Sequence, residues 1–137
     1  MSPPTDDGVY RVYTVQMSNW RLARDIDIPT IDITAKSGIP TFAPYWDDLM
    51  AYKRGEMSNE EYSHRYYEKV IPTILTDPQD WEVFAQHKRF ALVCYCRPGD
   101  FCHRYLFAML CVKYLECLGH RVEFEGEITR QDNRDQP

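Results

Sequence analysis

The sequence has no hydrophobic run long enough to cross a membrane as a helix. Its longest apolar stretch, Tyr105 to Val112, is ended by Lys113, whereas a spanning helix needs about 20 predominantly apolar residues. The first ten residues contain neither a basic segment nor an apolar one, so we expect no signal peptide. Internal repeats and low-complexity segments are also absent from the sequence. These absences favour a globular protein that does not enter a membrane.

The chain also lacks an excess of positive charge. Its 137 residues include 16 Lys and Arg against 21 Asp and Glu, which gives a formal net charge of −5. Such a chain offers no overall positive field to a phosphate backbone, so a general nucleic-acid coat protein is disfavoured, while a local basic pocket stays possible. The length and the ordinary composition are those of one folded domain. We expect this domain at residues 9–128, with flexible tails at residues 1–8 and 129–137.

Cysteine is not spread over the chain as a disulfide scaffold would require. The five cysteines, an odd number, all fall in one stretch: Cys94, Cys96, Cys102, Cys111 and Cys117. This placement indicates free thiols in a reducing, cytoplasmic compartment. Because cysteine is among the most frequently buried residue types, we expect Cys94, Cys111 and Cys117 to be packing residues.

The order of apolar segments predicts strands joined by helices. Apolar, β-branched and aromatic residues predict strands at residues 9–17, 30–34, 90–95 and 120–128. Helices are expected at residues 47–54, after Ser58, after Asp77 and at residues 102–118. We therefore predict a small three-layer α/β/α domain with a mainly parallel sheet of about four strands.

Local signals predict where several of these helices begin and end. Ser58 stands three residues before Glu61, which is the spacing of a capping box, and the helix that follows has an apolar stripe at i, i+4, i+8 and i+12. The stripe consists of Tyr62, Tyr66, Val70 and Ile74. Ser18 or Asn19 is expected to cap a short helix after the first strand, and Asp77 to cap a later one.

The segment between the third strand and the last helix contains most of the reactive side chains. It reads CYCRPGDFCHR from Cys94 to Arg104, and ligands of a parallel sheet bind beyond the carboxyl ends of its strands. Cys102 at a helix start is favoured as a thiolate, because the helix dipole and the adjacent His103 and Arg104 are positive. Cys96 is a second candidate nucleophile, with Arg104 as an anion clamp.

The same residues of this segment also have structural interpretations. Cys96 and Cys102 are also explained by packing, and Arg104 by an ion pair with Asp100 or Asp32. Protein tyrosine phosphatases and rhodaneses share the layout, but the phosphatase spacing Cys-x5-Arg is not met, because seven residues separate Cys96 from Arg104.

A metal site is a further alternative. Tetrahedral zinc takes four sulfur or nitrogen ligands, and the segment offers a set of that size: Cys94, Cys96, Cys102 and His103. Two features argue against it. Cys94 belongs to an apolar strand, and adjacent ligands such as Cys102 and His103 rarely point at one ion. We therefore predict no bound metal and no cofactor.

The segment LVCYCRPGDFCHRYLFA at residues 92–108 resembles the signature of the domain-of-unknown-function family 488, an apolar strand followed by a cysteine loop and a Cys-His-Arg helix start. YTVQMSN at residues 13–19, IDITAKSG at residues 31–38 and the segment from Phe42 to Tyr62 are similar to other parts of that family. The resemblance implies a small α/β domain and an unassigned activity. It carries over Cys96, Cys102, His103 and Arg104, together with Asp32 and Ser37 from the second loop. Thr34 stands where many relatives have Arg, a charge that Lys36 can supply.

Two functions from different classes fit these observations. The first is an enzyme that acts on a nucleotide, a nucleic acid or a phosphorylated substrate through Cys96 or Cys102, with Asp32 as base or hydroxyl acceptor. Its substrate-binding residues would be His103, Lys36, Ser37, Ser18, Trp20 and Tyr45, with the indole of Trp46 also available to stack a base. The second is a non-catalytic binding, inhibitor or adaptor protein that recognises a nucleotide or another protein. The aromatic loop from Phe42 to Trp46 would then contact a protein partner.

Overall fold

The computed structural model describes residues 7–96 and 101–130. Its strands are β1 (Val9–Gln16), β2 (Thr30–Asp32), β3 (Arg89–Cys94) and β4 (Arg121–Glu127). Its α-helices are α1 (Trp20–Asp25), α2 (Trp46–Lys53), α3 (Asn59–Val70), α4 (Thr73–Thr76), α5 (Pro78–Gln86) and α6 (His103–Cys117), and its 3-10 turns are η1 (Met17–Asn19) and η2 (Pro40–Phe42). The expectations for residues 1–6, for the turn at 97–100 and for the tail at 131–137 lie outside the described residues.

The four strands form one sheet in the order β2-β3-β1-β4. All three pairs of neighbouring strands are parallel, which confirms the predicted α/β class and a four-stranded sheet. Side chains alternate along β3, so that Phe90 and Leu92 face one core cluster and Ala91 and Val93 face the other. These four residues are buried, as expected for a strand that is covered on both faces.

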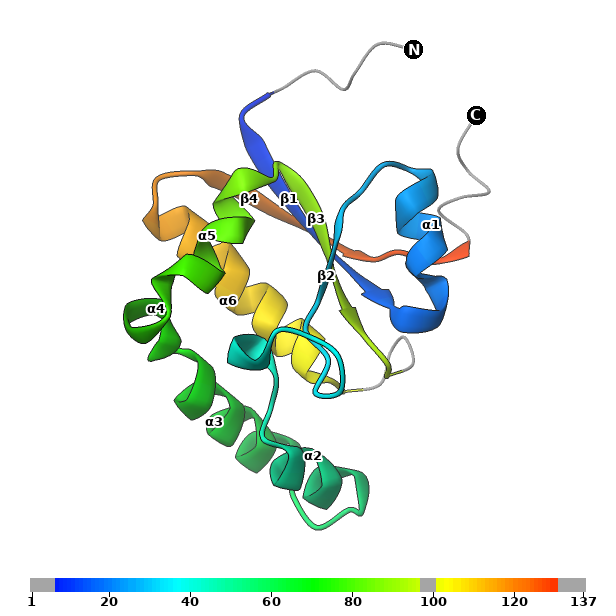
Figure 1. Cartoon of the computed structure of the whole chain (residues 1–137), viewed down its shortest axis with the longest axis vertical. Helices are drawn as coiled ribbons and strands as arrows, with labels where there is room; N and C mark the ends of the chain where they lie inside the picture. Colours follow the sequence, from blue (N-terminus) through cyan, green and yellow to red (C-terminus); the bar gives the residue numbers. More distant parts are fainter. Residues whose placement is uncertain (1–6, 97–100, 131–137) are drawn as a thin grey trace.

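Helices cover the two faces of the sheet unequally (Figure 1). On one face α3, α5 and α6 contribute to a large aromatic cluster that includes Trp81, Phe84 and Phe107. On the other face α1 closes a smaller cluster around Val15, Ala23 and Val93. The arrangement confirms the predicted three layers. The helices α2 and α3 pack against each other beyond the strand ends that carry the cysteine loop.

The second strand is shorter than predicted. It ends at Asp32 instead of residue 34, so Asp32 is a terminal residue and not the centre of a buried strand. Its carboxylate accepts hydrogen bonds from the backbone N–H of Thr34 at 2.8 Å and from the Ser37 hydroxyl at 2.6 Å. Because these bonds turn the chain out of the sheet, the strand cannot continue.

One predicted cap makes its side-chain hydrogen bond, whereas Asn19 and Asp77 stand at the predicted N-cap positions without one. The Ser58 hydroxyl accepts a hydrogen bond from the backbone N–H of Glu61 at 3.1 Å. Ser18 lies inside η1 and the Asn19 side chain makes no capping bond. Asp77 stands at the N-cap of α5, but its side chain does not cap that helix either.

The apolar stripe is confirmed over α3 and continues in a separate helix. Tyr62, Tyr66 and Val70 are buried, and α3 ends at Val70. Pro72 has no backbone N–H to donate, so the chain starts again as α4 and Ile74 packs on the core from there. No helix among the described residues is both long and apolar enough to span a membrane.

Candidate functional site

Three cysteine side chains meet where β3 ends and α6 begins. Cys94 is the last residue of β3, Cys96 lies in the following loop, and Cys102 is the N-cap of α6. The sulfur atom of Cys94 is 3.1 Å from that of Cys102 and 3.9 Å from that of Cys96, and all three sulfur atoms lie within 4.8 Å of one another. The sequence placed Cys96 and Cys102 at this edge of the sheet but treated Cys94 as a packing residue in every interpretation except the metal alternative. The structure adds Cys94 to the group.

The two remaining cysteines lie outside this group. Cys111 is buried in the large core cluster, as expected. Cys117 is exposed, so the expectation that it packs in the core is wrong. It is the last residue of α6, where the helix leaves the core.

The imidazole of His103 is buried and lies beside the three sulfur atoms. Its ring is 2% exposed, and Nε2 lies 2.7 Å from the carbonyl oxygen of Ile33. Because a carbonyl can only accept, we assign the hydrogen to Nε2, which leaves Nδ1 with a free lone pair in the neutral ring. Nδ1 lies 3.8 Å from the sulfur of Cys94 and 3.7 Å from that of Cys102. Burial lowers the pKa of His103 and so favours this neutral form.

The three thiols share charge unequally. The hydrogen-bond contacts of its sulfur with Cys102 and Cys96 lower the pKa of Cys94 to about 3. The contact with Cys94 raises the pKa of Cys102. The sequence favoured a thiolate at Cys102, since that residue begins a helix. The neighbouring thiols, which local sequence does not reveal, shift the first negative charge to Cys94.

Arg104 lies behind the sulfur group and has no exposed surface. Its Nε donates to Oε1 of Glu127 at 3.2 Å, and its Nη1 donates to the carbonyl oxygen of Cys96 at 2.7 Å. Nη1 is also 3.7 Å from the sulfur of Cys102. Among the described residues, the partner of this buried guanidinium is therefore Glu127 of β4 and not Asp32, while the alternative partner Asp100 lies outside the described residues. Its contacts hold the loop and the start of α6 in place.

Asp32 and Ser37 come together, but away from the sulfur atoms. Besides the bond between these two residues, Ser37 contacts the Thr34 hydroxyl at 3.0 Å, and this small network closes the loop after β2. Asp32 and Ser37 line a shallow hollow of about 520 Å³ that contains none of the cysteines. Lys36 projects from the same loop and lines a different cavity, one that does contain Cys94, Cys96 and His103.

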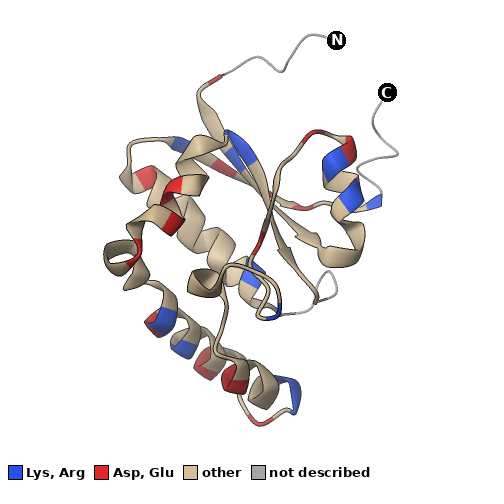
Figure 2. Cartoon of the chain, in the orientation of Figure 1, with Lys and Arg blue, Asp and Glu red and all other residues tan. Residues whose placement is uncertain are grey.

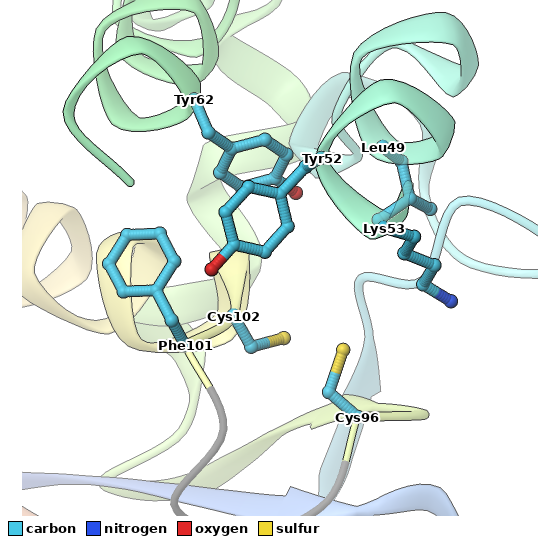
Figure 3. A pocket seen from close by; sticks show the side chains of 7 residues that line it. All are labelled: Leu49, Tyr52, Lys53, Tyr62, Cys96, Phe101 and Cys102. Atoms are coloured by element: carbon cyan, nitrogen blue, oxygen red, sulfur yellow. The ribbon is translucent and has the colours of Figure 1, made fainter. Parts of the chain in front are cut away.

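Two cavities border the sulfur group, and α2 separates them. The larger one, of about 470 Å³, is lined by Thr34, Ala35, Lys36, Trp46, Leu49, Met50, Lys53, Cys94, Tyr95, Cys96 and His103. The smaller one, of about 260 Å³, is lined by Leu49, Tyr52, Lys53, Tyr62, Cys96, Phe101 and Cys102. Figure 3 shows the smaller cavity, with the sulfur atoms of Cys96 and Cys102 below the rings of Tyr52 and Tyr62. Leu49, Lys53 and Cys96 border both cavities.

Besides Ser37, three more of the predicted binding residues lie outside both cavities. Ser18 is part of η1, and Trp20 of α1 has the guanidinium groups of Arg21 and Arg24 5.4 Å and 5.1 Å from its ring centroid. Tyr45 lines a separate hollow of about 160 Å³ beside Lys69.

The aromatic loop is divided between the core and the surface. Phe42 is fully buried in the large core cluster, whereas Tyr45 and Trp46 are exposed. The loop can therefore offer Tyr45 and Trp46 to a partner, but not Phe42. Sequence reasoning did not identify the α2 residues Leu49, Met50 and Lys53 as lining residues. No local signal marks them, because their role depends on how α2 packs over the strand ends.

The resemblance to a known family is tested by comparison with family models. The model described as the active DUF488-N3 subclade matches residues 2–114, which include β3, the cysteine loop and most of α6. The matched range ends before β4, whose Glu127 holds Arg104. Searches of curated proteins and of solved structures gave no match. Because the family model covers more than half of the sequence, the chain belongs to the DUF488 family, in the subclade described as active.

Proposed function

We propose that the protein is an enzyme that acts on a small anionic, nucleotide-like ligand bound in the 470 Å³ cavity. One observation carries the proposal: the cationic side chains of Lys36 and Lys53 line the same cavity as Cys94, Cys96 and His103. The cavity thus combines groups that attract an anion with groups that act as nucleophiles or bases.

The two lysines supply a local positive charge in a protein whose net charge is −5. Within residues 7–96 and 101–130, neither Lys36 nor Lys53 has a carboxylate partner in an ion pair. Figure 2 marks a basic position at the end of α2 and another near the loop that follows β2. Uncompensated cations beside a concave site attract an anionic group such as a phosphate.

Apart from Lys53, the residues of α2 that line the cavity are apolar or aromatic. Trp46 is half exposed and lines the cavity together with Leu49 and Met50. An indole face at such a place suits the stacking of a flat ring. A ligand with both a negative group and a flat ring therefore matches this cavity better than inorganic phosphate alone.

The floor of the cavity favours chemistry over simple binding. Cys94 has a strongly lowered pKa, and thiolates are the nucleophilic form of cysteine. Binding of an anion needs the lysines but does not need a thiolate, which would repel it. We therefore assign the lysines to binding and the sulfur group to reaction.

Ligand binding is tested by thermal shift with a nucleoside monophosphate, the matching nucleoside and inorganic phosphate. We expect the monophosphate to stabilise the protein most, because it has both a negative group and a flat ring. A ligand at 100 times its Kd raises the free energy of unfolding by about 2.7 kcal/mol. Lys53→Ala and Trp46→Ala should each reduce this shift. Lys113→Ala is the matched control, since Lys113 is an exposed residue on α6 that faces Glu116 at 4.0 Å and lines neither cavity.

Turnover is tested by mass spectrometry of the ligand after incubation with the protein. Chemical change of a ligand that binds through Lys53 would support the proposal that the protein is an enzyme. Tight binding without any change would instead support the second candidate function, a non-catalytic binding protein. The exposed pair Tyr45 and Trp46 favours this second candidate, because aromatic residues are enriched at protein interfaces.

A further inference from the structure

We propose that Cys94, Cys96, Cys102 and His103 bind one zinc ion through their three sulfur atoms and the Nδ1 atom of the imidazole. The site goes beyond the proposed function and does not depend on it. The lysines would bind a nucleotide-like ligand with or without the ion, and the sulfur atoms would face that ligand as zinc-bound thiolates instead of free ones. The site also replaces our expectation from the sequence that no metal is bound.

Five of the six distances between the four ligand atoms are close to the edges of a tetrahedral zinc site. Zn–S bonds of about 2.3 Å and Zn–N bonds of about 2.0–2.1 Å give edges of about 3.8 Å between sulfur atoms and about 3.6 Å between sulfur and nitrogen. The structure has 3.1 and 3.9 Å for two sulfur pairs and 3.8 and 3.7 Å from Nδ1 to Cys94 and Cys102. Because the third sulfur pair lies within 4.8 Å, these five edges are each within about 1 Å of the ideal.

The orientation of His103 is the second, independent observation. Its Nε2–H is held by the carbonyl oxygen of Ile33 at 2.7 Å, which turns the lone pair of Nδ1 toward the sulfur atoms. A ligating histidine in proteins usually donates its other ring N–H to a carbonyl or carboxylate in this way. The imidazole is also buried, so its tautomer and direction are fixed before an ion arrives.

The charge around the four ligands suits a zinc ion that is bound by three thiolates. Three thiols lose their protons to solvent when they ligate Zn²⁺, so three thiolates, one neutral imidazole and the ion carry a net charge of −1. The guanidinium of Arg104 lies 3.7 Å from the sulfur of Cys102 and compensates this charge. The ligand set excludes Mg²⁺ and Ca²⁺, which prefer oxygen donors, and selects zinc-like metals that prefer sulfur and nitrogen.

The site would fix the floor of the 470 Å³ cavity, to which Cys94, Cys96 and His103 contribute. With four protein ligands the coordination sphere is closed, as in structural zinc sites. The ion would thus join the end of β3, the loop and the start of α6. It would also keep the sulfur atoms at the cavity floor as thiolates.

The test is the metal content and the cobalt spectrum of the full-length chain, purified with a reductant and without chelator. We expect about one zinc per chain by elemental analysis. After exchange for Co²⁺, we expect the sulfur-to-cobalt charge-transfer band and the intense visible bands of a tetrahedral thiolate site. Zinc should also protect three of the five thiols from a thiol reagent in the folded protein.

Variants identify the ligands. Cys102→Ser and His103→Ala should each weaken Co²⁺ binding by more than the about 10- to 100-fold that loss of an outer-shell partner causes. In His103→Ala the visible spectrum should change as well, because the nitrogen ligand is lost. Cys117→Ser, which removes the exposed cysteine, is the matched control and should bind Co²⁺ like the wild type. Circular dichroism shows whether each variant folds, and thiol protection in the wild type gives an answer even if one does not.

Three results would overturn the proposal. Absence of metal in the purified protein together with no thiolate band on addition of Co²⁺ would show that the cysteines are thiols that bind no metal. A loss of two mass units in the metal-free protein that reductant reverses would show a disulfide between Cys94 and Cys102 instead. Equal weakening of Co²⁺ binding by Cys117→Ser would place the ion elsewhere. None of these results affects the ligand test in the 470 Å³ cavity, so the two proposals fail separately.

Discussion

Replacement of Arg104 by Ala should destabilise the protein strongly, because it leaves the carboxylate of Glu127 without its cation. The guanidinium is fully buried, and the side chain of Glu127 is only 13% exposed. Glu127 also accepts a hydrogen bond from the Thr14 hydroxyl at 2.6 Å, so it ties β1 and β4 to α6. The pair therefore lies at a junction of the sheet and the helix, and not on the surface.

The magnitude follows from burial. Removal of one partner of a buried ion pair costs about 3–5 kcal/mol, since the other charge stays desolvated. A domain of this size has a total stability of about 5–15 kcal/mol, so the variant would be close to unfolding. With an unfolding entropy of about 2.1 cal/mol/K per residue over 137 residues, the same loss lowers Tm by roughly 10–17 °C.

The assay is urea unfolding followed by far-UV circular dichroism on a series of variants. Arg104→Lys keeps the charge but loses the planar fork, and should fall between the wild type and Arg104→Ala. The double variant Arg104→Met/Glu127→Leu removes both charges and should recover most of the loss. Arg54→Ala is the matched control, because Arg54 and Glu56 are both exposed in their ion pair, so that the substitution should cost about 0–1 kcal/mol.

The reasoning would be refuted if Arg104→Ala cost less than about 1 kcal/mol, which is the range of surface pairs. It would also be refuted if the double variant were no more stable than the single one. In either case Arg104 would not act as the buried cation that Glu127 requires, and a direct role in ligand binding would again be open.

Three further predictions concern the fold. Ser58→Ala removes the hydroxyl that caps α3 and should lower the free energy of unfolding by about 1 kcal/mol in urea; an unchanged urea midpoint would contradict this. Gly38→Ala places a Cβ against the backbone N–H of Thr34 and 2.6 Å from the Asp32 carbonyl oxygen, so it should cost at least about 1–3 kcal/mol, and a variant as stable as wild type would mean that this loop relaxes. Phe107→Ala empties the centre of the large core cluster and should lower the free energy of unfolding by about 3–5 kcal/mol in the same measurement. A clearly smaller loss would mean that neighbouring side chains collapse into the cavity.

The fold could be predicted from the sequence because its main signals are local. The uninterrupted apolar segment around Leu92 marks a strand that is covered on both faces, and a parallel sheet follows from strands that alternate with helices. The capping box at Ser58 fixes the start of α3 in the same direct way. Boundaries were less certain where a side chain competes with the backbone, as Asp32 does at the end of β2.

The site could be predicted only in part, because its parts come together through tertiary contacts. The cysteine loop was identified from its residues, yet the partner of Arg104 stands 23 residues further along the chain. Lys53 and Trp46 line the large cavity only because α2 packs over the strand ends. Asp32 and Lys36 belong to one loop but lie on different hollows, and no spacing rule separates two side chains that are four residues apart in an irregular segment.

Cys102 and His103 can face one ion although they are adjacent in the sequence, and the reason is geometric. Neighbouring side chains diverge within a regular element, since they alternate across a strand and are about 100° apart around a helix. Here α6 begins between Cys102 and His103. Cys102 is the N-cap with extended backbone angles, φ −154° and ψ 150°, while His103 is the first residue of α6. The change of backbone direction brings the sulfur of Cys102 within 3.7 Å of Nδ1 of His103. Two adjacent residues can therefore serve one ion where a helix starts between them.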